Sequence, residues 1–226
     1  MQRGKRRGQV TWSVQTHKHG KEEAMKLTLA QIVKAFIRDC YRKSAQKELR
    51  WFKEQPSFAE ALENAALAKN CCGKRFAHQR RMQEKALKEA KDGLQKKTHQ
   101  LKKSKNFDEL LVCIEQAIKP IYGLNEVYCY DTAFRLGAYL GHLPTKVYLH
   151  AGTRIGAKKI VDVGPKARAV EIRNLPSELT KHLKPYEIED FLCIFKDHLG
   201  KGRKRSKKLP SCLRCTTKLI HHKIPE

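Results

Sequence analysis

Apolar residues recur at steps of three and four positions along much of this chain, and that spacing constrains the fold more than any other feature. It is clearest between residues 22 and 50, where the apolar positions are Met25, Leu29, Ile32, Val33, Phe36, Ile37 and Tyr41. One face of an amphipathic helix needs this spacing, whereas a half-buried strand would alternate apolar and polar residues. The pattern predicts a helix over about 22–50 and, with the helices described below, an all-α, multi-helix globular core.

Two further helix starts carry capping sequences. Ser57 stands three residues before Glu60, and Asn106 stands three residues before Glu109. At this spacing each side chain accepts a hydrogen bond from the other residue's backbone N–H, which fixes the first helical turn. We therefore expect helices over about 57–70 and 107–118.

The remaining segments give weaker patterns. A helix is expected from about residue 128 to 140, and others are expected after Pro176 and Pro185, because the first turn of a helix tolerates proline. Residues 147–152 are apolar and bounded by turn-forming residues, so their pattern fits either a short strand or a helix.

Positive charge dominates the composition. The chain contains 48 Lys and Arg against 23 Asp and Glu, which gives a net charge of +25. A surplus of this size repels itself unless a polyanion lies nearby, so nucleic acid is the expected partner. Much of the surplus falls in residues 74–105, which we interpret as one long helix with a narrow apolar seam. The nucleic-acid contacts expected there are Arg80, Arg81, Lys85 and Lys88. The alternative is an ordinary solvated helix face.

Composition divides the chain into four parts. Residues 1–21 form a basic N-terminal arm, 22–105 a helical region with the long basic helix, 106–198 a second helical domain, and 199–226 a basic tail. Further nucleic-acid contacts are expected from the tail residues Arg203, Lys204 and Arg205.

Membrane insertion and export are not expected. No run of the chain approaches the about 20 apolar residues of a transmembrane helix, and the first residues lack the apolar segment of a secretory signal. We therefore expect a cytoplasmic protein whose eight cysteines are reduced.

The segment between the helices at 107–118 and 128–140 carries the most informative motif. It reads Ile121-Tyr122-Gly123-Leu124-Asn125 and resembles the loop of a helix-hairpin-helix motif. In that motif, residues with positive φ turn the chain so that backbone N–H groups and a helix N-terminus bind a DNA phosphate. Gly123 supplies one such residue, and Asn125 stands where the family has its second glycine.

This resemblance implies phosphate contacts through the backbone of Gly123, Leu124 and Asn125. It also implies fixation of the protein on the DNA backbone rather than reading of a base sequence. Glu126 departs from the pattern, because it places a carboxylate beside the expected phosphate site.

Residues 108–175 are also similar, in the order and spacing of their motifs, to the endonuclease III-like superfamily of DNA glycosylases. Lyase-type members have a Schiff-base lysine before a Thr-Ala pair, where this chain has Asp131 before Thr132 and Ala133. A match of His150 to the family's histidine puts Tyr148 at the position of the catalytic aspartate. A Schiff base needs an amine and an oxocarbenium-like sugar needs a carboxylate, so the resemblance implies neither activity residue by residue.

A group of uncharacterised bacterial proteins is also similar over the central and C-terminal part. The matching segments include residues 137–139, 148–154 and 187–192. This second resemblance implies no activity.

An enzyme is the alternative to a binding protein. Asp131, Tyr148 and His150 are the candidate catalytic residues, with His150 as a general base and Arg154 as the group that holds a phosphate or carboxylate. The structural alternative is that His150 satisfies a buried carbonyl, Tyr148 packs in the core and Asp131 caps the N-terminus of a helix.

The C-terminal tail offers zinc-ligand types. Cys212, Cys215, His221 and His222 could supply two thiolates and two imidazoles, although the spacing is shorter than in a Cys₂His₂ finger. We interpret these residues as part of a basic tail with free thiols, and we expect no cofactor.

The sequence therefore predicts a protein that binds the phosphate backbone of duplex DNA with little sequence preference. The alternatives are a divergent glycosylase-like enzyme that acts on a damaged or flipped base, and a basic RNA-associated protein. Single-strand binding by stacking is not predicted from composition, because aromatic residues make up only 8% of the chain and do not alternate with the basic ones.

Overall fold

The computed structural model describes residues 27–38 and 41–200 of the 226-residue chain. That part of the chain is mostly helical, with ten α-helices, three short 3₁₀ helices and one antiparallel pair of two-residue strands. The predicted all-α core is therefore confirmed. No helix within the described ranges is both long and apolar enough to cross a bilayer.

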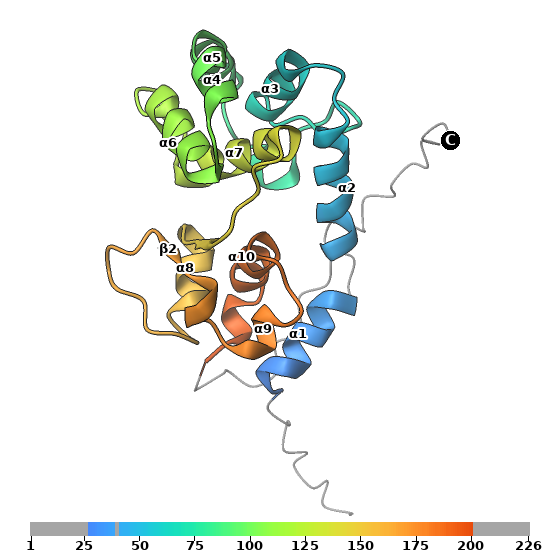
Figure 1. Cartoon of the computed structure of the whole chain (residues 1–226), viewed down its shortest axis with the longest axis vertical. Coiled ribbons are helices and arrows are strands. Elements are labelled where there is room, and N and C mark those ends of the chain that lie inside the picture. Colours follow the sequence, from blue (N-terminus) through green and yellow to red (C-terminus); the bar gives the residue numbers. More distant parts are fainter. Residues whose placement is uncertain (1–26, 39–40, 201–226) are drawn as a thin grey trace, which may run out of the picture.

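The described residues form two lobes, which Figure 1 shows one above the other. The helices of the first lobe are α2 (Tyr41–Lys53), α3 (Phe58–Ala66), α4 (Glu84–Lys96), α5 (Thr98–Lys103), α6 (Phe107–Ile118) and α7 (Glu126–Leu140). The helices of the second lobe are α1 (Leu29–Arg38), α8 (Ala151–Ala157), α9 (Ser177–Thr180) and α10 (Pro185–Ile194). Strands β1 (Val147–Tyr148) and β2 (Ala169–Val170) pair antiparallel beside α8.

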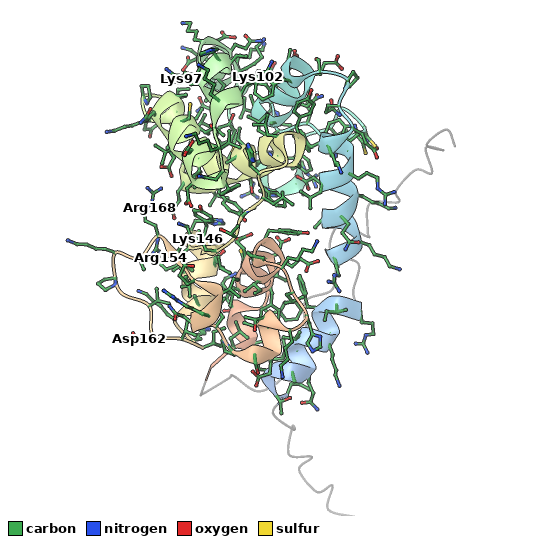
Figure 2. All side chains as sticks on the ribbon, viewed as in Figure 1. Lys97, Lys102, Lys146, Arg154, Asp162 and Arg168 are labelled. Carbon is green, nitrogen blue, oxygen red and sulfur yellow. The ribbon has the colours of Figure 1, made fainter. Side chains whose placement is uncertain are left out.

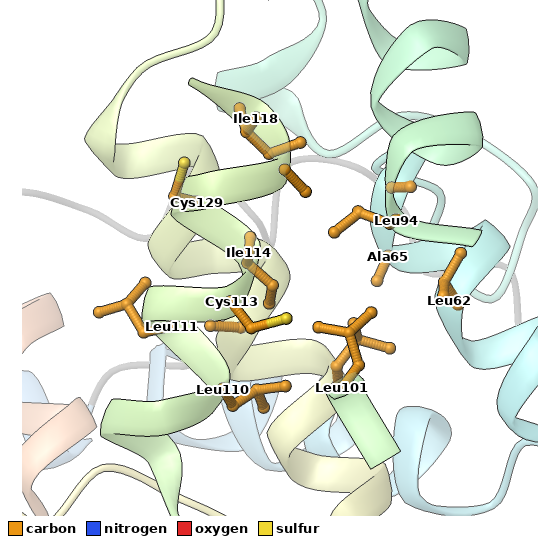
Figure 3. Close-up of a cluster of buried hydrophobic side chains, with 14 of the residues drawn as sticks. Leu62, Ala65, Leu94, Leu101, Leu110, Leu111, Cys113, Ile114, Ile118 and Cys129 are labelled. Atoms are coloured by element: carbon orange, nitrogen blue, oxygen red, sulfur yellow. The ribbon is translucent and has the colours of Figure 1, made fainter. Parts of the chain in front are cut away.

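The core of the first lobe lies between α3, α4, α6 and α7. Leu94 of α4 and Leu110 of α6 are fully buried, as is Leu101 of α5. Figure 3 shows the side chains of α6 facing Leu94 and Leu101, with Leu62 of α3 beyond them. Burial of one such side chain stabilises the fold by about 1.5–3 kcal/mol.

The second lobe has a separate, aromatic core. Phe36 of α1 packs edge-on against Phe191 of α10, with ring centroids 5.7 Å apart, and against Phe195 at 6.1 Å. Helices α8 and α10 approach closely at Gly156, where a Cβ would lie 2.2 Å from the carbonyl oxygen of Leu192. Helix α1 therefore belongs to the lobe built mainly from the C-terminal part of the chain.

The two cores divide the chain differently from the expected ranges 22–105 and 106–198. The first core contains buried residues from Phe52 to Tyr148, so it extends across the expected boundary without interruption. The second contains Ile32, Val33 and Phe36 together with residues from Val147 onward. Arg42 joins the lobes, because its Nε donates a hydrogen bond of 2.8 Å to Oε1 of Glu187 on α10.

The long basic helix predicted over 74–105 is wrong. Residues 69–83 form an irregular loop with an isolated bridge between Lys69 and Arg75 and one 3₁₀ turn, η1 (Ala77–Gln79). Helices α4 and α5 follow, with a break at Lys97. Tertiary contacts hold this loop: Arg75 Nη1 donates to the carbonyl of Met82 at 2.8 Å, and the buried side chain of Gln79 is bound to α7.

The helix predicted over 22–50 is two helices, α1 and α2, because the first packs in one lobe and the second in the other. The undecided segment 147–152 is a strand followed by a helix start, with His150 as the N-cap residue of α8.

Both predicted N-cap residues are confirmed, but the return bond from the N-cap N–H is not among the bonds of the described residues: Oε1 of Glu60 accepts from Oγ of Ser57, and Oε2 of Glu109 accepts from the N–H of Lys105. The backbone N–H of Glu60 donates to Oγ of Ser57 at 3.2 Å, and that of Glu109 donates to Oδ1 of Asn106 at 2.9 Å. By contrast, Asp131 does not cap a helix. Helix α7 begins at Glu126, so Asp131 lies in its second turn.

Candidate functional site

The loop between α6 and α7 projects a narrow turn from the first lobe. Gly123 has a φ of +89°, as predicted, and nothing lies within 4 Å of the position of a Cβ there. The glycine is therefore required by the backbone conformation rather than by lack of space. Ile121 and Leu124 pack against the core on either side, which leaves Tyr122 and Gly123 at the exposed tip.

Asn125 does not have the positive φ expected of a second glycine. Its φ of −128° and ψ of −177° are extended, and it is the N-cap residue of α7. Its Oδ1 accepts hydrogen bonds from the N–H groups of Val127 at 3.1 Å and Tyr128 at 3.2 Å. The prediction failed because a side chain that caps the helix stabilises the extended conformation.

Two backbone donors remain open at the tip. The N–H groups of Gly123 and Asn125 donate to no acceptor among the residues that the structure describes. The expected third donor, Leu124, follows the turn at Tyr122 and Gly123, which directs its N–H back toward the carbonyl of Ile121. They precede the N-terminus of a 15-residue helix, whose dipole favours a negative charge there.

The side chain of Glu126, next to this tip, is bound to the second lobe. Its Oε1 accepts a hydrogen bond of 3.1 Å from the backbone N–H of Ala151, at the start of α8 in the second lobe. The carboxylate that departs from the family pattern is thus bound at the lobe junction, where it holds the N-termini of α7 and α8 together.

The predicted contact residues of the 74–105 segment lie on the surface. Arg80 and Arg81 are exposed in the loop after η1, and Lys85 and Lys88 are exposed on α4. Lys88 forms an ion pair of 3.0 Å with Glu84 one turn earlier. Arg80, Arg81 and Lys85 form no ion pair within the described ranges, so their charged groups are accessible to a ligand.

The guanidinium of Arg154 is not free to hold the expected phosphate or carboxylate, because it is bound to the backbone. Its Nη2 donates a hydrogen bond of 2.7 Å to the carbonyl of Leu149, and its Nη1 donates to the carbonyl of Ala167. The guanidinium therefore fixes β1 to the loop before β2.

Figure 2 shows further basic residues at two places: Lys97 and Lys102 at the α4–α5 end, and Lys146 and Arg168 near the lobe junction. Lys146 and Arg168 pair with Asp108 and Glu115 of α6 respectively.

A polar cluster lies where α7 meets η1. Oδ2 of Asp131 is 2.7 Å from Nε2 of His78 and accepts a hydrogen bond of 3.0 Å from Nε2 of Gln79. Burial raises the pKa of Asp131, but the hydrogen bond with His78 and the charge of Arg135 outweigh it and lower that pKa. Asp131 is therefore an ionised carboxylate that orients a half-exposed imidazole.

His150 lies deeper at the lobe junction. It is 7% exposed, and its ring packs 4.8 Å from that of Tyr130. Its Nε2 is 3.3 Å from Oε1 of Glu189, which in turn accepts a hydrogen bond of 2.6 Å from Oγ1 of Thr153. Burial lowers the pKa of His150, against the opposing charges of Asp131 and Glu126, so the imidazole is neutral near pH 7.

The hydroxyl of Tyr148 does not join Asp131 and His150 in the expected catalytic pocket. It donates a hydrogen bond to Oδ1 of Asp108, in the first turn of α6. Burial raises the pKa of Asp108, but the bonds from Tyr148 and Lys146 outweigh it and lower that pKa. The expected pocket of Asp131, Tyr148, His150 and Arg154 is thus not assembled: Tyr148 and Arg154 are bound elsewhere.

The structure adds residues that the sequence did not single out for this cluster. His78 and Gln79 lie about 50 residues before Asp131, and Glu189 lies 36 residues after Thr153. No spacing rule connects such distant positions, and only the lobe arrangement brings them together.

The described ranges contain no group of three or more His, Cys, Asp or Glu side chains arranged to hold a metal ion. The predicted contacts Arg203, Lys204 and Arg205 and the candidate ligands Cys212, Cys215, His221 and His222 lie outside those ranges.

Comparisons with protein-family models, with curated proteins and with solved structures found no match to this chain. The arguments that follow therefore depend on the residues and their geometry.

Proposed function

We propose that this protein binds the phosphate backbone of duplex DNA with little sequence preference. The observation that supports it best is the α6–α7 turn. Its tip carries two unbonded N–H groups, at Gly123 and Asn125, immediately before the N-terminus of α7. Such donors and a helix dipole together form a site for a phosphate oxygen.

The backbone of the α6–α7 turn is preorganised for this phosphate contact. Ile121 and Leu124 pack against the core, and Asn125 caps α7, so the backbone at Gly123 is held before any ligand arrives. Binding then requires little ordering of the loop, which preserves affinity. Contacts of this kind place a protein on DNA and do not distinguish base sequences.

The basic residues supply the remaining attraction. With a net charge of +25, the chain is expected to release condensed counterions from DNA, and the exposed Arg80, Arg81 and Lys85 are expected to contribute to this release. Each phosphate neutralised contributes about 0.9 to the slope of log affinity against log salt.

A binding assay with matched glycine variants tests the loop. A fluorescent duplex is titrated with wild type, Gly123→Val and Gly141→Val over a salt series. Gly141 is the control because it also has a positive φ, +79°, with open space around it, but ends α7 at the opposite end. Both variants place a branched side chain at a positive φ, and only Gly123→Val is expected to weaken binding at every salt concentration.

Equal binding by the two glycine variants would contradict the role of the loop. Charge alone would then explain the affinity, and a competition between duplex DNA and structured RNA would decide whether the protein is RNA-associated instead. A double variant Arg80→Gln/Arg81→Gln is expected to reduce the salt slope by about two.

The pair of His78 and Asp131 favours an enzyme as the second candidate. A carboxylate at 2.7 Å from one ring nitrogen leaves the other nitrogen free to take a proton, the arrangement of a general base. In a glycosylase-like enzyme this base would activate water for attack on a sugar whose base has been flipped out. Incubation of a damaged duplex with wild type, His78→Gln and Asp131→Asn tests it: loss of base release with retained binding would support the enzyme.

A further inference from the structure

Tyr122 is the most exposed large hydrophobic residue in the described part of the chain. Its exposed fraction is 95%, against 51% for Ile155 and 46% for Val112. The ring lies at the tip of the α6–α7 turn, next to the two open N–H groups, and both of its faces are open to solvent. Single exposed apolar residues are common, so the inference depends on the surroundings of this one.

The backbone under Tyr122 is held from both sides. Before it, the N–H of Ile121 donates a hydrogen bond of 2.8 Å to the carbonyl of Ile118, and the side chain of Ile121 packs on the core. After it, Gly123 reverses the chain and Leu124 packs on the same core. Two partly buried anchors, Ile121 and Leu124, therefore hold the intervening residue at the surface, where its ring is exposed.

The charged residues around the turn favour a negatively charged ligand. Lys119 is exposed just before the tip, and the first acidic residue after it, Glu126, is bound through its carboxylate to Ala151 of the second lobe. A negatively charged ligand with flat apolar faces matches this combination. A nucleotide has both, a phosphate for the N–H groups and a base for the ring.

The two features belong to adjacent residues. Tyr122 supplies the ring and Gly123 the N–H, so the same turn presents both to a ligand. In a continuous duplex both faces of each base are stacked on other bases. A base face becomes available only where stacking is interrupted, at an end, a gap or an unpaired nucleotide.

We propose that Tyr122 is a base-stacking residue that directs the protein to duplex DNA with an unstacked base beside the phosphate bound by the loop. This rests on the proposed function, because the ring reaches a base only if the turn contacts the backbone. The protein is thereby selective for DNA structure, although it does not read base sequence.

The experiment compares two fluorescent duplexes of the same sequence and length, one continuous and one with a short single-stranded gap. Wild type is compared with Tyr122→Phe, which keeps the ring, and Tyr122→Leu, which keeps apolar bulk without a ring. Wild type and Tyr122→Phe are expected to prefer the gapped duplex by about tenfold or more, from the usual contribution of one stacked base. Tyr122→Leu is expected to bind both duplexes with the affinity of wild type for the continuous one.

A second measurement reports the contact directly. Tyr122→Trp introduces an indole at the tip, whose emission is expected to be quenched by the gapped duplex and not by the continuous one. Wild type, with its Trp12 and Trp51, gives the background to be subtracted. Because Tyr122 is exposed, all these variants are expected to fold as wild type does. Circular dichroism of each variant checks this.

The outcomes separate the two proposals. If wild type binds neither duplex, or if Gly123→Val binds both as wild type does, the proposed function fails. If duplex binding depends on Gly123 but Tyr122→Leu keeps the preference for the gap, only the stacking role is overturned. Equal binding of both duplexes by wild type also overturns it and would leave the ring as a contact for another protein.

Discussion

Nε2 of His78 lies 2.7 Å from Oδ2 of Asp131, although 53 residues separate them in the chain. The same oxygen accepts the hydrogen bond from Gln79, whose side chain is fully buried. Asp131 thus attaches η1, and with it the exposed residues Arg80 and Arg81, to the second turn of α7. The attachment places the start of the basic segment on the helix that begins at the α6–α7 turn.

Asp131→Asn is expected to lower the free energy of unfolding by about 1–2 kcal/mol near pH 7, because the pair loses its charge and its hydrogen-bond geometry. The pKa of Asp131 is below its ordinary value of 3.8 in the folded chain, so its contribution is full above that value and is lost as the pH falls through the folded pKa. Urea unfolding measured near neutral pH and at acid pH should show the difference from wild type shrinking in acid. The control is Asp162→Asn, at an exposed position, where no change is expected. A constant difference at both pH values would contradict the role of the charge.

Gly156→Ala is expected to destabilise the second lobe by about 1–3 kcal/mol, the usual cost of an overpacked contact. The added Cβ would lie 2.2 Å from the carbonyl oxygen of Leu192 and 2.8 Å from its carbonyl carbon, so α8 and α10 must separate. Thermal unfolding of Gly156→Ala measures this loss of stability. Gly164→Ala is the control, because nothing lies within 4 Å of a Cβ at Gly164. Equal melting temperatures for the two variants would show that the helices separate at no cost.

Local interactions explain which parts of the fold could be predicted. The caps at Ser57 and Asn106 depend on residues three positions away, so the sequence alone contains the whole interaction. The α6–α7 turn was likewise found from Gly123, because only a glycine adopts its φ of +89° without strain. Asn125 was assigned the wrong conformation, since an asparagine is suited to both a left-handed turn and a helix cap.

Long-range contacts explain what could not be predicted. The regular spacing of Leu87, Leu94 and Leu101 lies within α4 and α5, and the predicted helix extended it back to residue 74. Residues 69–83 are instead a loop, which the bridge of Lys69 with Arg75 and the bond of Gln79 to Asp131 hold in place. A buried glutamine has no sequence signature, because glutamine is mostly an exposed residue. The same holds for Glu189, which is buried beside His150.

Arg135 and Glu48 form an ion pair whose disruption is expected to be costly. Arg135 is 2% exposed, its Nε donates to Oε1 of Glu48 at 3.0 Å, and its guanidinium lies 3.9 Å from the ring centroid of Phe76. Glu48→Ala leaves this buried cation without its carboxylate, so we expect a loss of about 3 kcal/mol in the free energy of unfolding.

Removal of the cation as well should restore part of that loss. The double variant Glu48→Ala/Arg135→Met replaces the buried charge by an apolar side chain that still packs on Phe76, and it is expected to be more stable than Glu48→Ala alone. Denaturant unfolding of the wild type, both single variants and the double variant gives the coupling energy. Additive effects of the two substitutions would mean that the pair contributes nothing beyond its separate side chains.

His150 is expected to make stability depend on pH just below neutrality. Its pKa in the folded chain is below the ordinary value of 6.5, because burial opposes the charged imidazole and Arg154 and His78 add to that effect, while Asp131, Glu126 and Glu189 oppose it. As the pH falls below 6.5, the unfolded chain therefore takes up a proton that the folded chain does not, and stability decreases.

Between about pH 7.5 and about pH 5.5 this single group lowers the free energy of unfolding by at most about 1.4 kcal/mol. In His150→Gln, with a neutral side chain of similar size, the decrease over the same interval should be smaller by that amount. Denaturant unfolding at the two pH values gives both numbers, and an equal decrease in wild type and variant would show that His150 takes up its proton as readily in the folded chain as in the unfolded one.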